Sequence, residues 1–444
     1  MELCRIALLK HNYTALIANN VNLPIIYMVN IESHILTKSP MKVLYLHPVG
    51  SLGGATKSLI ELFKQLHLRG VVGVVVTPRG KSSDAFQDSG MTAIVGQRLS
   101  QFDNTRHGYY RHLRWIILLR ELVHFPASLA QLWRVRKEQF DLIHLNEITL
   151  LPVGIIAKCL FKRPLIVHVR SLQRGLETGW RTRLVNKLLA RFADAVIAID
   201  HTVASTLPAA LPLHVVHNGV NMPARNGCVS SQKGPSEKPV RVGFLGMLIP
   251  LKGIRELVQA MLILRQRGVQ IECWIAGENA HTFTGISAWA LRKLGFAWDI
   301  RTELELFIAQ HDLGEQVRLL GFVSDVHTIY PQLDIVCFPS FLDAAGRPVF
   351  EAALYGIPSV LAISNPMPDA VLHEVTGLAI TTSEPVVIAD ALQRLAENKI
   401  YREQLGKQAL DWANTEFSIQ KSAGLIYDIY FKLTSSRTTA SRPN

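Results

Sequence analysis

Short apolar runs rich in β-branched residues alternate with amphipathic stretches of helical period along most of the chain, and this alternation starts twice. Strands that alternate with helices in this way are typical of parallel α/β sheets. A segment rich in Gly, Ser and Pro, Arg225–Pro239, separates the two series. We therefore predict an α/β protein with two doubly wound, Rossmann-like domains that face each other across a cleft. The expected strands are Val43–His47, Val72–Val76, Leu142–Leu145, Leu165–Val169, Ala195–Ile199 and His214–His217, followed by Val240–Leu245, Ile271–Ala276, Val317–Leu320, Ile335–Phe338 and Ser359–Ala362.

A chain of 444 residues has the length of two ordinary domains. Residues 1–40 lack the basic region and cleavage site of a secretory signal, and their asparagines make a poor bilayer helix. We treat them as an extension of doubtful status. The expected division is a first domain over 41–221, a linker over 222–239, a second domain over 240–410, a helix over 411–433 that crosses back to the first domain, and a disordered polar tail over 434–444.

The formal net charge of +12 is concentrated in the first domain. Residues 101–191 contain 16 Lys and Arg against 6 Asp and Glu. This surplus is either an ordinary solvated face or a surface for an anionic partner. The five cysteines lie far apart without the spacing of zinc ligands, which argues against a disulfide framework or a zinc site.

Two turns of the first domain have a composition that suits ligand contact. Gly53 and Gly54 follow the first strand and precede a helix, where backbone N–H groups can approach a phosphate or a sugar. Asn218 lies in the sequence HNGVN at the domain junction. Each could also be only a tight turn. Neither G-x-G-x-x-G nor G-x-x-x-x-G-K-[ST] is present, so NAD binding and a P-loop are disfavoured.

The second domain opens with a strand that leads into a loop containing Gly246, and Lys252 stands where the next helix begins. A cation beside free N–H groups suits a diphosphate. A solvated loop lysine is the alternative, and this segment alone does not decide between them.

The most specific segment, 338–358, reads strand, glycine loop and short helix. Asp343 and Glu351 flank Gly346 with seven residues between them. Glu351 lies among apolar residues, where a carboxylate needs partners because burying an unpaired charge is costly. Sugar hydroxyls or a structural salt bridge would both meet that need.

These motifs, in this order from Met41 to Leu433, resemble the retaining GT-B glycosyltransferases of family 4, also called glycosyl transferases group 1. The resemblance rests mainly on D-x₇-E followed by A-x-x-x-G-x-P, and on the L-G-F segment at 320–322. Two positions depart from the family pattern. Met247 stands where the family usually has Arg, and Asp343 where it usually has Glu.

The resemblance implies a nucleotide-diphosphate sugar as donor and transfer to an acceptor hydroxyl with retained configuration. It implies catalytic roles for Lys252 against the leaving diphosphate, Glu351 on the ribose, Asp343 on the donor sugar and His168 on the acceptor side. The implied donor-binding residues are Gly53, Gly54, Asn218, Gly246, Phe322, Val323, Ala345, Gly346 and Arg347, of which Arg347 could replace the charge missing at Met247.

No Asp has another two residues further on, so the D-x-D motif of metal-dependent glycosyltransferases is absent and we expect no metal and no other cofactor. Three other interpretations remain open: a GT-B sugar-nucleotide epimerase, a phosphorylase, or a degenerate glycosyltransferase that serves as a non-catalytic partner subunit.

The basic surplus includes two candidate membrane-facing stretches. Tyr109–Arg120 places apolar residues at helical spacing beside Arg111 and Arg114, and Arg134 and Arg136 follow. Such a stripe is equally typical of a core-facing helix. Together with the charge, it favours a cytoplasmic protein at the inner face of the membrane, with a lipid-linked or envelope polysaccharide acceptor and no nucleic-acid partner.

Overall fold

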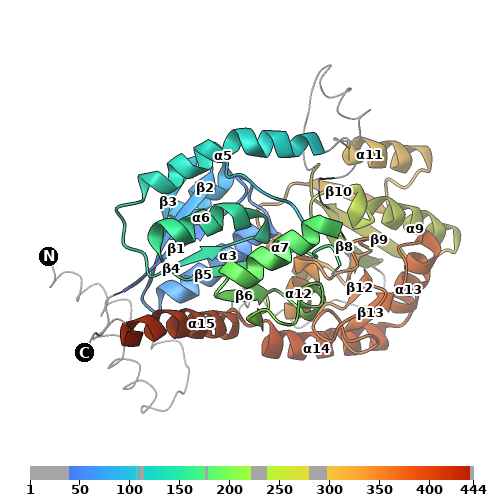
Figure 1. Ribbon diagram of the computed structural model, residues 1–444. Coiled ribbons are helices and arrows are strands. Elements are labelled where there is room, and N and C mark those ends of the chain that lie inside the picture. Colours follow the sequence, from blue (N-terminus) through green and yellow to red (C-terminus); the bar gives the residue numbers. More distant parts are fainter. Residues whose placement is uncertain are drawn as a thin grey trace, which may run out of the picture.

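The computed structural model describes residues 40–106, 108, 110, 115–175, 179–221, 238–279 and 298–440. The expected extension at 1–39, most of the linker, and the arginines at positions 111 and 114 lie outside these residues. Figure 1 shows two α/β units side by side, each with a central sheet between helices.

The first unit is built on a parallel sheet of seven strands in the order β3-β2-β1-β4-β5-β6-β7. Its elements are β1 (Met41–Leu46), α3 (Gly54–His67), β2 (Val71–Pro78), α4 (Lys81–Asp88), β3 (Thr92–Gly96), α5 (Ile116–Arg134), β4 (Leu142–Leu145), α6 (Leu151–Phe161), β5 (Leu165–Val169), α7 (Gly179–Phe192), β6 (Ala195–Ala198), α8 (His201–Ala204) and β7 (Leu213–Val215), with a 3-10 turn at Ile148–Leu150. The strand β3 was not expected from the sequence.

The second unit has a parallel sheet of six strands in the order β10-β9-β8-β11-β12-β13. Its elements are β8 (Val240–Leu245), α9 (Ile254–Gln266), β9 (Ile271–Ala276), α11 (Ile300–Gln310), β10 (Val317–Gly321), β11 (Ile335–Phe338), α12 (Arg347–Leu354), β12 (Ser359–Ala362), β13 (Gly377–Ile380), α13 (Pro385–Glu397) and α14 (Lys399–Glu416), with 3-10 turns at Pro250–Lys252, Val326–Thr328 and Tyr330–Gln332. Five of its six strands match the predicted ranges closely.

Helices cover both faces of the first sheet, as parallel sheets require. Along β1, Leu44 and Leu46 pack toward α5, α6 and α7, while Val43 and Tyr45 pack toward α3. The alternation follows from the period of two along a strand.

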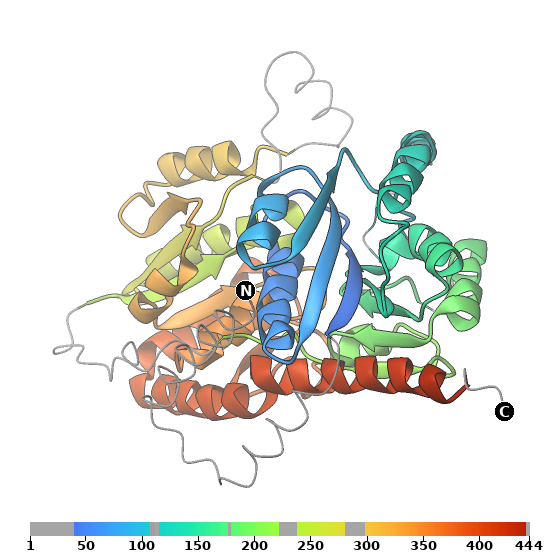
Figure 2. The same ribbon diagram turned by 90° about the vertical axis from the view of Figure 1, so that its left-hand side faces the viewer.

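The final helix α15 (Ile419–Ala440) packs on the first sheet, although α14 belongs to the second unit. Figure 2 shows α14 and α15 running end to end beneath the two units. The break between them lies at residues 417–418, later than the expected boundary at 410, because Ala409 and Ala413 still pack on Leu354 of α12. The polar residues 434–440, expected to be disordered, continue α15, since extending a formed helix costs little compared with starting one.

Candidate functional site at the facing strand ends

The predicted site residues lie mostly in loops that follow the carboxyl ends of parallel strands, where α/β sheets bind ligands. In the first unit these loops follow β1 and β5, and in the second they follow β8, β10 and β11. Arg347 of the second unit touches α3 of the first, so the two sets of loops meet.

Gly53 and Gly54 mark the start of α3. Gly53 has extended backbone as the residue before the helix, and a Cβ atom added to either glycine would have no other atom within 4 Å. Packing and backbone conformation therefore leave both positions free for side chains. The open space beside the first N–H groups of a 14-residue helix suits a ligand oxygen.

Lys252 lies in the turn after β8, and its ammonium group is held against Gly246. Gly246 has a φ of 146°, and a Cβ atom there would come within 2.8 Å of the Lys252 Nζ. The next residue, Gly253, has a φ of 67° and packs so closely on the carbonyl of Pro339 that a Cβ atom would lie 1.8 Å from it. Glycines on both sides of the lysine thus fix its position.

The Lys252 ammonium has no carboxylate partner among the described residues; the aromatic ring of Phe338 lies 6.0 Å away. Burial lowers the pKa of Lys252 to about 8. A buried cation without a counter-charge is costly, and an anionic ligand would relieve that cost.

The two carboxylates of the D-x₇-E motif have separate surroundings. Glu351 on α12 is 7% exposed and accepts hydrogen bonds from the Tyr330 hydroxyl at 2.7 Å and from Arg347 Nε at 2.6 Å. Asp343 has a φ of 54°, which aspartate tolerates better than most residues. It accepts from the Ser364 backbone N–H at 2.8 Å.

Arg347 bridges the two units. Its Nη2 donates to both carboxylate oxygens of Glu61 on α3, at 2.7 and 2.6 Å, and its Nη1 donates to Ser58 Oγ at 2.8 Å. Burial alone would lower the pKa of Arg347, but Glu351 and Glu61 raise it above its ordinary value. Arg347 is thus engaged by two carboxylates and is not a free replacement for the arginine missing at Met247.

The remaining donor-side residues form the wall around this bridge. Phe322 follows β10, is 55% exposed, and lies 5.1 Å below the Lys81 ammonium of the first unit. Val323 is partly buried in the second unit. Gly346 precedes α12 and lies against the Phe338 ring, where a Cβ atom would come within 2.4 Å. Ala345 packs on the same phenylalanine.

His168 lies in β5, as expected, but it is buried. It is only 2% exposed, and its ring is hydrogen-bonded to His144, which in turn contacts Tyr430 of α15. Burial, Arg170 and His144 together hold the pKa of His168 well below its ordinary value. His168 is thus a buried neighbour of Arg170, whose Nη2 lies 3.4 Å from its Nδ1, and its role on the acceptor side stays a prediction.

Arg170, which the sequence analysis missed, directly follows β5 and is partly buried. It donates to the side-chain oxygens of Asn146 and Asn218. Burial lowers its pKa to about 10, Glu147 counteracts this, and the nearby Arg347 lowers it further. Two cations, one from each unit, thus lie near each other. Because Arg170 follows a predicted strand directly, the strand-end rule that pointed to His168 could have found it.

A cavity of about 470 Å³ lies in the second unit at the ends of β11, β12 and β13. Its wall includes Asp343, Ser364, Glu256 and Thr381. Of the predicted site residues, only Asp343 lines it, so this cavity adjoins the Asp343 side of the site and does not include Lys252 or Glu351.

Comparison with known families agrees with this geometry. Glycosyltransferase Family 4 matches residues 52–222, and Glycosyl transferases group 1 matches residues 229–412. The two matches cover the two α/β units and divide within the segment that joins them.

The relatives have low sequence identity to this chain but align with most of its length. Capsular polysaccharide biosynthesis glycosyltransferase CapM of Staphylococcus aureus is 22% identical over 73% of this chain and 84% of its own length. D-inositol 3-phosphate glycosyltransferase of Corynebacterium jeikeium (strain K411) is 25% identical over 86% of this chain and 93% of its own. Among solved structures, Anabaena Alr3699/HepE in complex with UDP and glucose superimposes with a TM-score of 0.67 at 23% identity, covering 88% of this chain and 99% of that one. The expected GT-B fold is confirmed.

Proposed function

Because the chain belongs to the group 1 glycosyltransferases, with a first domain of the family 4 type, we propose that it transfers a sugar from a nucleotide diphosphate to an acceptor hydroxyl with retained anomeric configuration. The observation that carries this proposal is Lys252, a buried ammonium that no described carboxylate neutralises. An anionic diphosphate bound here would supply the negative charge that stabilises the Lys252 ammonium.

The mechanism follows from where charge develops. Glycosidic cleavage passes through an oxocarbenium-like transition state, and negative charge builds up on the leaving diphosphate. Lys252 and the N–H groups near Gly54 and Gly346 are preorganised donors for that charge. Removing one such donor typically costs about 3–4 kcal/mol of transition-state stabilisation. No metal is required in this scheme, since the protein supplies the positive charge.

We assign Glu351 to the ribose hydroxyls and Asp343 to the donor sugar. Glu351 already accepts from Tyr330 and Arg347, which hold the carboxylate in one orientation. Asp343 is held by Ser364 beside the cavity in the second unit. The exposed Phe322 ring is the natural surface for the base. Anabaena Alr3699/HepE was solved with UDP-glucose, which supports a nucleotide sugar as the donor.

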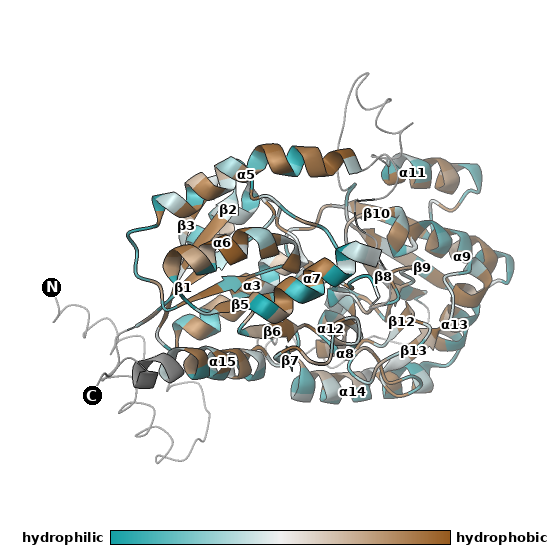
Figure 3. Cartoon of the chain, in the orientation of Figure 1, coloured by the Kyte–Doolittle hydropathy of each residue, from teal (hydrophilic) through white to brown (hydrophobic). Residues whose placement is uncertain are grey.

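For the acceptor, we propose a lipid-linked or envelope polysaccharide at an anionic membrane surface. The support comes from α5, where Ile116, Leu119, Leu122 and Val123 are 64, 62, 58 and 75% exposed. Figure 3 shows apolar residues along this helix at the edge of the first unit. CapM of Staphylococcus aureus, a capsular polysaccharide biosynthesis glycosyltransferase, is a relative with this class of product.

Basic residues lie at the end of the same helix. Arg134 and Arg136 are exposed, and the Arg136 guanidinium lies 4.6 Å from the ring of Trp133, itself 57% exposed. Cations and aromatic rings together suit an anionic interface. In the described part of the chain, no helix has the length and apolar character to span a bilayer. Surface attachment is therefore the form of membrane contact that we propose.

A thermal-shift screen against UDP-, GDP-, ADP- and dTDP-sugars tests donor binding, because a ligand that binds only the folded state raises its apparent stability. The best donor should shift the wild type and lose that shift in Lys252→Met. If no nucleotide sugar shifts the wild type, the non-catalytic subunit becomes the better interpretation.

Liposome co-sedimentation tests the acceptor side. Binding should increase with anionic lipid, fall with salt, and weaken in a Leu119→Ser/Val123→Ser variant. Leu306→Ser, which alters an equally exposed leucine on α11, serves as the control. If the wild type does not bind anionic liposomes at low salt, a soluble acceptor becomes the better interpretation.

A further inference from the structure

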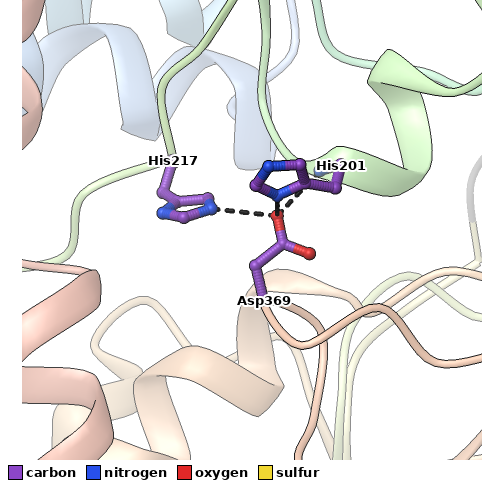
Figure 4. Close-up of side chains that lie close together, drawn as sticks. All are labelled: His201, His217 and Asp369. Carbon is purple, nitrogen blue, oxygen red and sulfur yellow. Dashed lines mark hydrogen bonds and ion pairs between the residues drawn. The ribbon is translucent and has the colours of Figure 1, made fainter.

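A second polar cluster, separate from the donor-side residues, joins the two units. His201 is the first residue of α8, His217 follows β7, and Asp369 lies in the segment between β12 and β13. Figure 4 shows both imidazole rings pointing at the Asp369 carboxylate. The distance from Oδ2 is 2.8 Å to His201 Nδ1 and 3.0 Å to His217 Nε2.

The two carboxylate oxygens of Asp369 are used unequally. Oδ2 accepts from both imidazoles and also from the His201 backbone N–H at 2.7 Å. Oδ1 is buried and has no hydrogen-bond partner in the described residues. Asp369 is only 6% exposed, and a buried carboxylate oxygen without a partner is costly. Oδ1 is therefore available to a ligand, although in Figure 4 it points away from the two rings.

The geometry suits one metal ion. The ligand atoms of the three residues all lie within 4.8 Å of one another. Small rotations of these side chains would bring the three atoms to about 2.0–2.2 Å from one ion, and two imidazoles with one carboxylate form a common ligand set for zinc. The His201 side chain is 59% exposed, which gives an ion access and leaves room for water as a fourth ligand.

The cluster also lies where the chain passes between the units. The ring of Phe417, at the break before α15, lies 4.9 Å from the His217 ring. Three residues after His217, the backbone N–H of Val220 donates to the Phe417 carbonyl at 2.9 Å. The described start of the first connection, residues 217–221, therefore runs beside the second connection at 417–418, next to this cluster.

We propose that His201, His217 and Asp369 form a binding site for one Zn²⁺ ion, which ties the two domains together at their hinge. The site is independent of the donor chemistry proposed above, for which no metal is expected. Its ligands lie up to 168 residues apart in the chain, so no sequence spacing could indicate it. Without zinc, the same residues still join the two units through hydrogen bonds.

The test uses the full-length, tag-free protein, stripped with EDTA and titrated with ZnCl₂ against a chromogenic chelator. We expect one tight site per chain and a rise in melting temperature. Co²⁺ in place of Zn²⁺ should give visible absorption bands of a site with nitrogen and oxygen ligands. A wild type that takes up no stoichiometric zinc overturns the proposal.

His201→Gln is the primary variant, because its exposed ring can be replaced while its backbone bond to Asp369 remains. Zinc affinity should fall by at least the roughly 10–100-fold that changes around a metal site cause. His217→Gln and Asp369→Asn should abolish the site if they fold. His311→Gln, on a histidine outside the cluster, should bind as the wild type does. Equal zinc affinity in His201→Gln and the wild type would place the ion elsewhere and refute the assignment.

Amide hydrogen exchange tests whether the bound zinc also restrains the two connections between the units. In the wild type, Zn²⁺ should slow exchange at residues 217–221 and 417–419, and it should not do so in His201→Gln. Stoichiometric zinc without protection at either connection would contradict the hinge role.

Discussion

Replacing Lys252 by Met removes the ammonium while keeping a stem of similar length. Burial lowers the pKa of this lysine from 10.5 to about 8. At about 1.4 kcal/mol for each pH unit, holding the charge in the unliganded protein costs up to about 3.5 kcal/mol. Lys252→Met should therefore stabilise the free protein by about 1–3 kcal/mol near pH 6.5, while it removes donor binding.

The effect has a defined pH dependence. The folded-state pKa lies below the unfolded one, so between pH 8 and 10.5 the unfolded chain binds more protons and the wild type gains stability as pH rises. The stability difference between Lys252→Met and the wild type should thus be largest below pH 8 and should disappear by about pH 10.5. At about 2–4 °C per kcal/mol for domains of this size, the difference is measurable.

Thermal and urea unfolding of both proteins at pH 6.5 and 9.5, with and without UDP, provide the assay. UDP should raise the melting temperature of the wild type at pH 6.5, less so at pH 9.5, and not that of the variant. Two results would refute this role of Lys252 as a buried cation that binds a diphosphate. One is a lower stability of Lys252→Met than of the wild type at pH 6.5, and the other is an equal rise in melting temperature with UDP.

Three further predictions concern the bridge and the donor chemistry. Glu351→Gln should retain the fold, because Arg347 keeps its bond to Glu61, yet turnover of the best nucleotide sugar should fall about 10²-fold or more; near-normal rates would reject Glu351 as a site residue. Arg347→Met leaves the buried Glu351 and the partly buried Glu61 without their cation, so urea denaturation should report a loss of about 3–5 kcal/mol, and an unchanged midpoint would count against the bridge. EDTA should leave the initial rate of sugar transfer unchanged, whereas strict dependence on an added metal would contradict a mechanism based on protein cations.

The sequence predicted the elements with strong local patterns. Leu142–Leu145 and Leu165–Val169 are apolar except for one histidine each, and the structure has them within the same bounds. The strands β3 and β13 were missed because Thr92–Gly96 is only partly buried and Gly377–Ile380 begins with glycine, so neither has a clear apolar pattern.

Partnerships between distant residues could not be predicted. Arg347 and Glu61 meet across 286 residues, and nothing local indicates that the arginine is engaged by a carboxylate of the other domain. His168 and Arg170 lie two residues apart, but only the packing of α15 on the sheet shows that the histidine is buried. The strand-end rule pointed to this region, and tertiary contacts distinguish its two side chains: His168 is buried, whereas Arg170 is partly buried.

The position of α15 has a consequence for synthesis of the protein. Val43, Tyr45 and Ile166 of the first sheet pack against Ile426 and Tyr430, which are made after the whole second domain. About 200 residues separate the end of the first domain from this helix, and at about 5–20 residues per second the ribosome needs roughly 10–40 s to supply it. During that time one apolar face of the nascent first domain lacks its cover. The first domain therefore cannot complete its fold while the second is being translated, and chaperone binding to the emerging chain should persist until α15 leaves the ribosome.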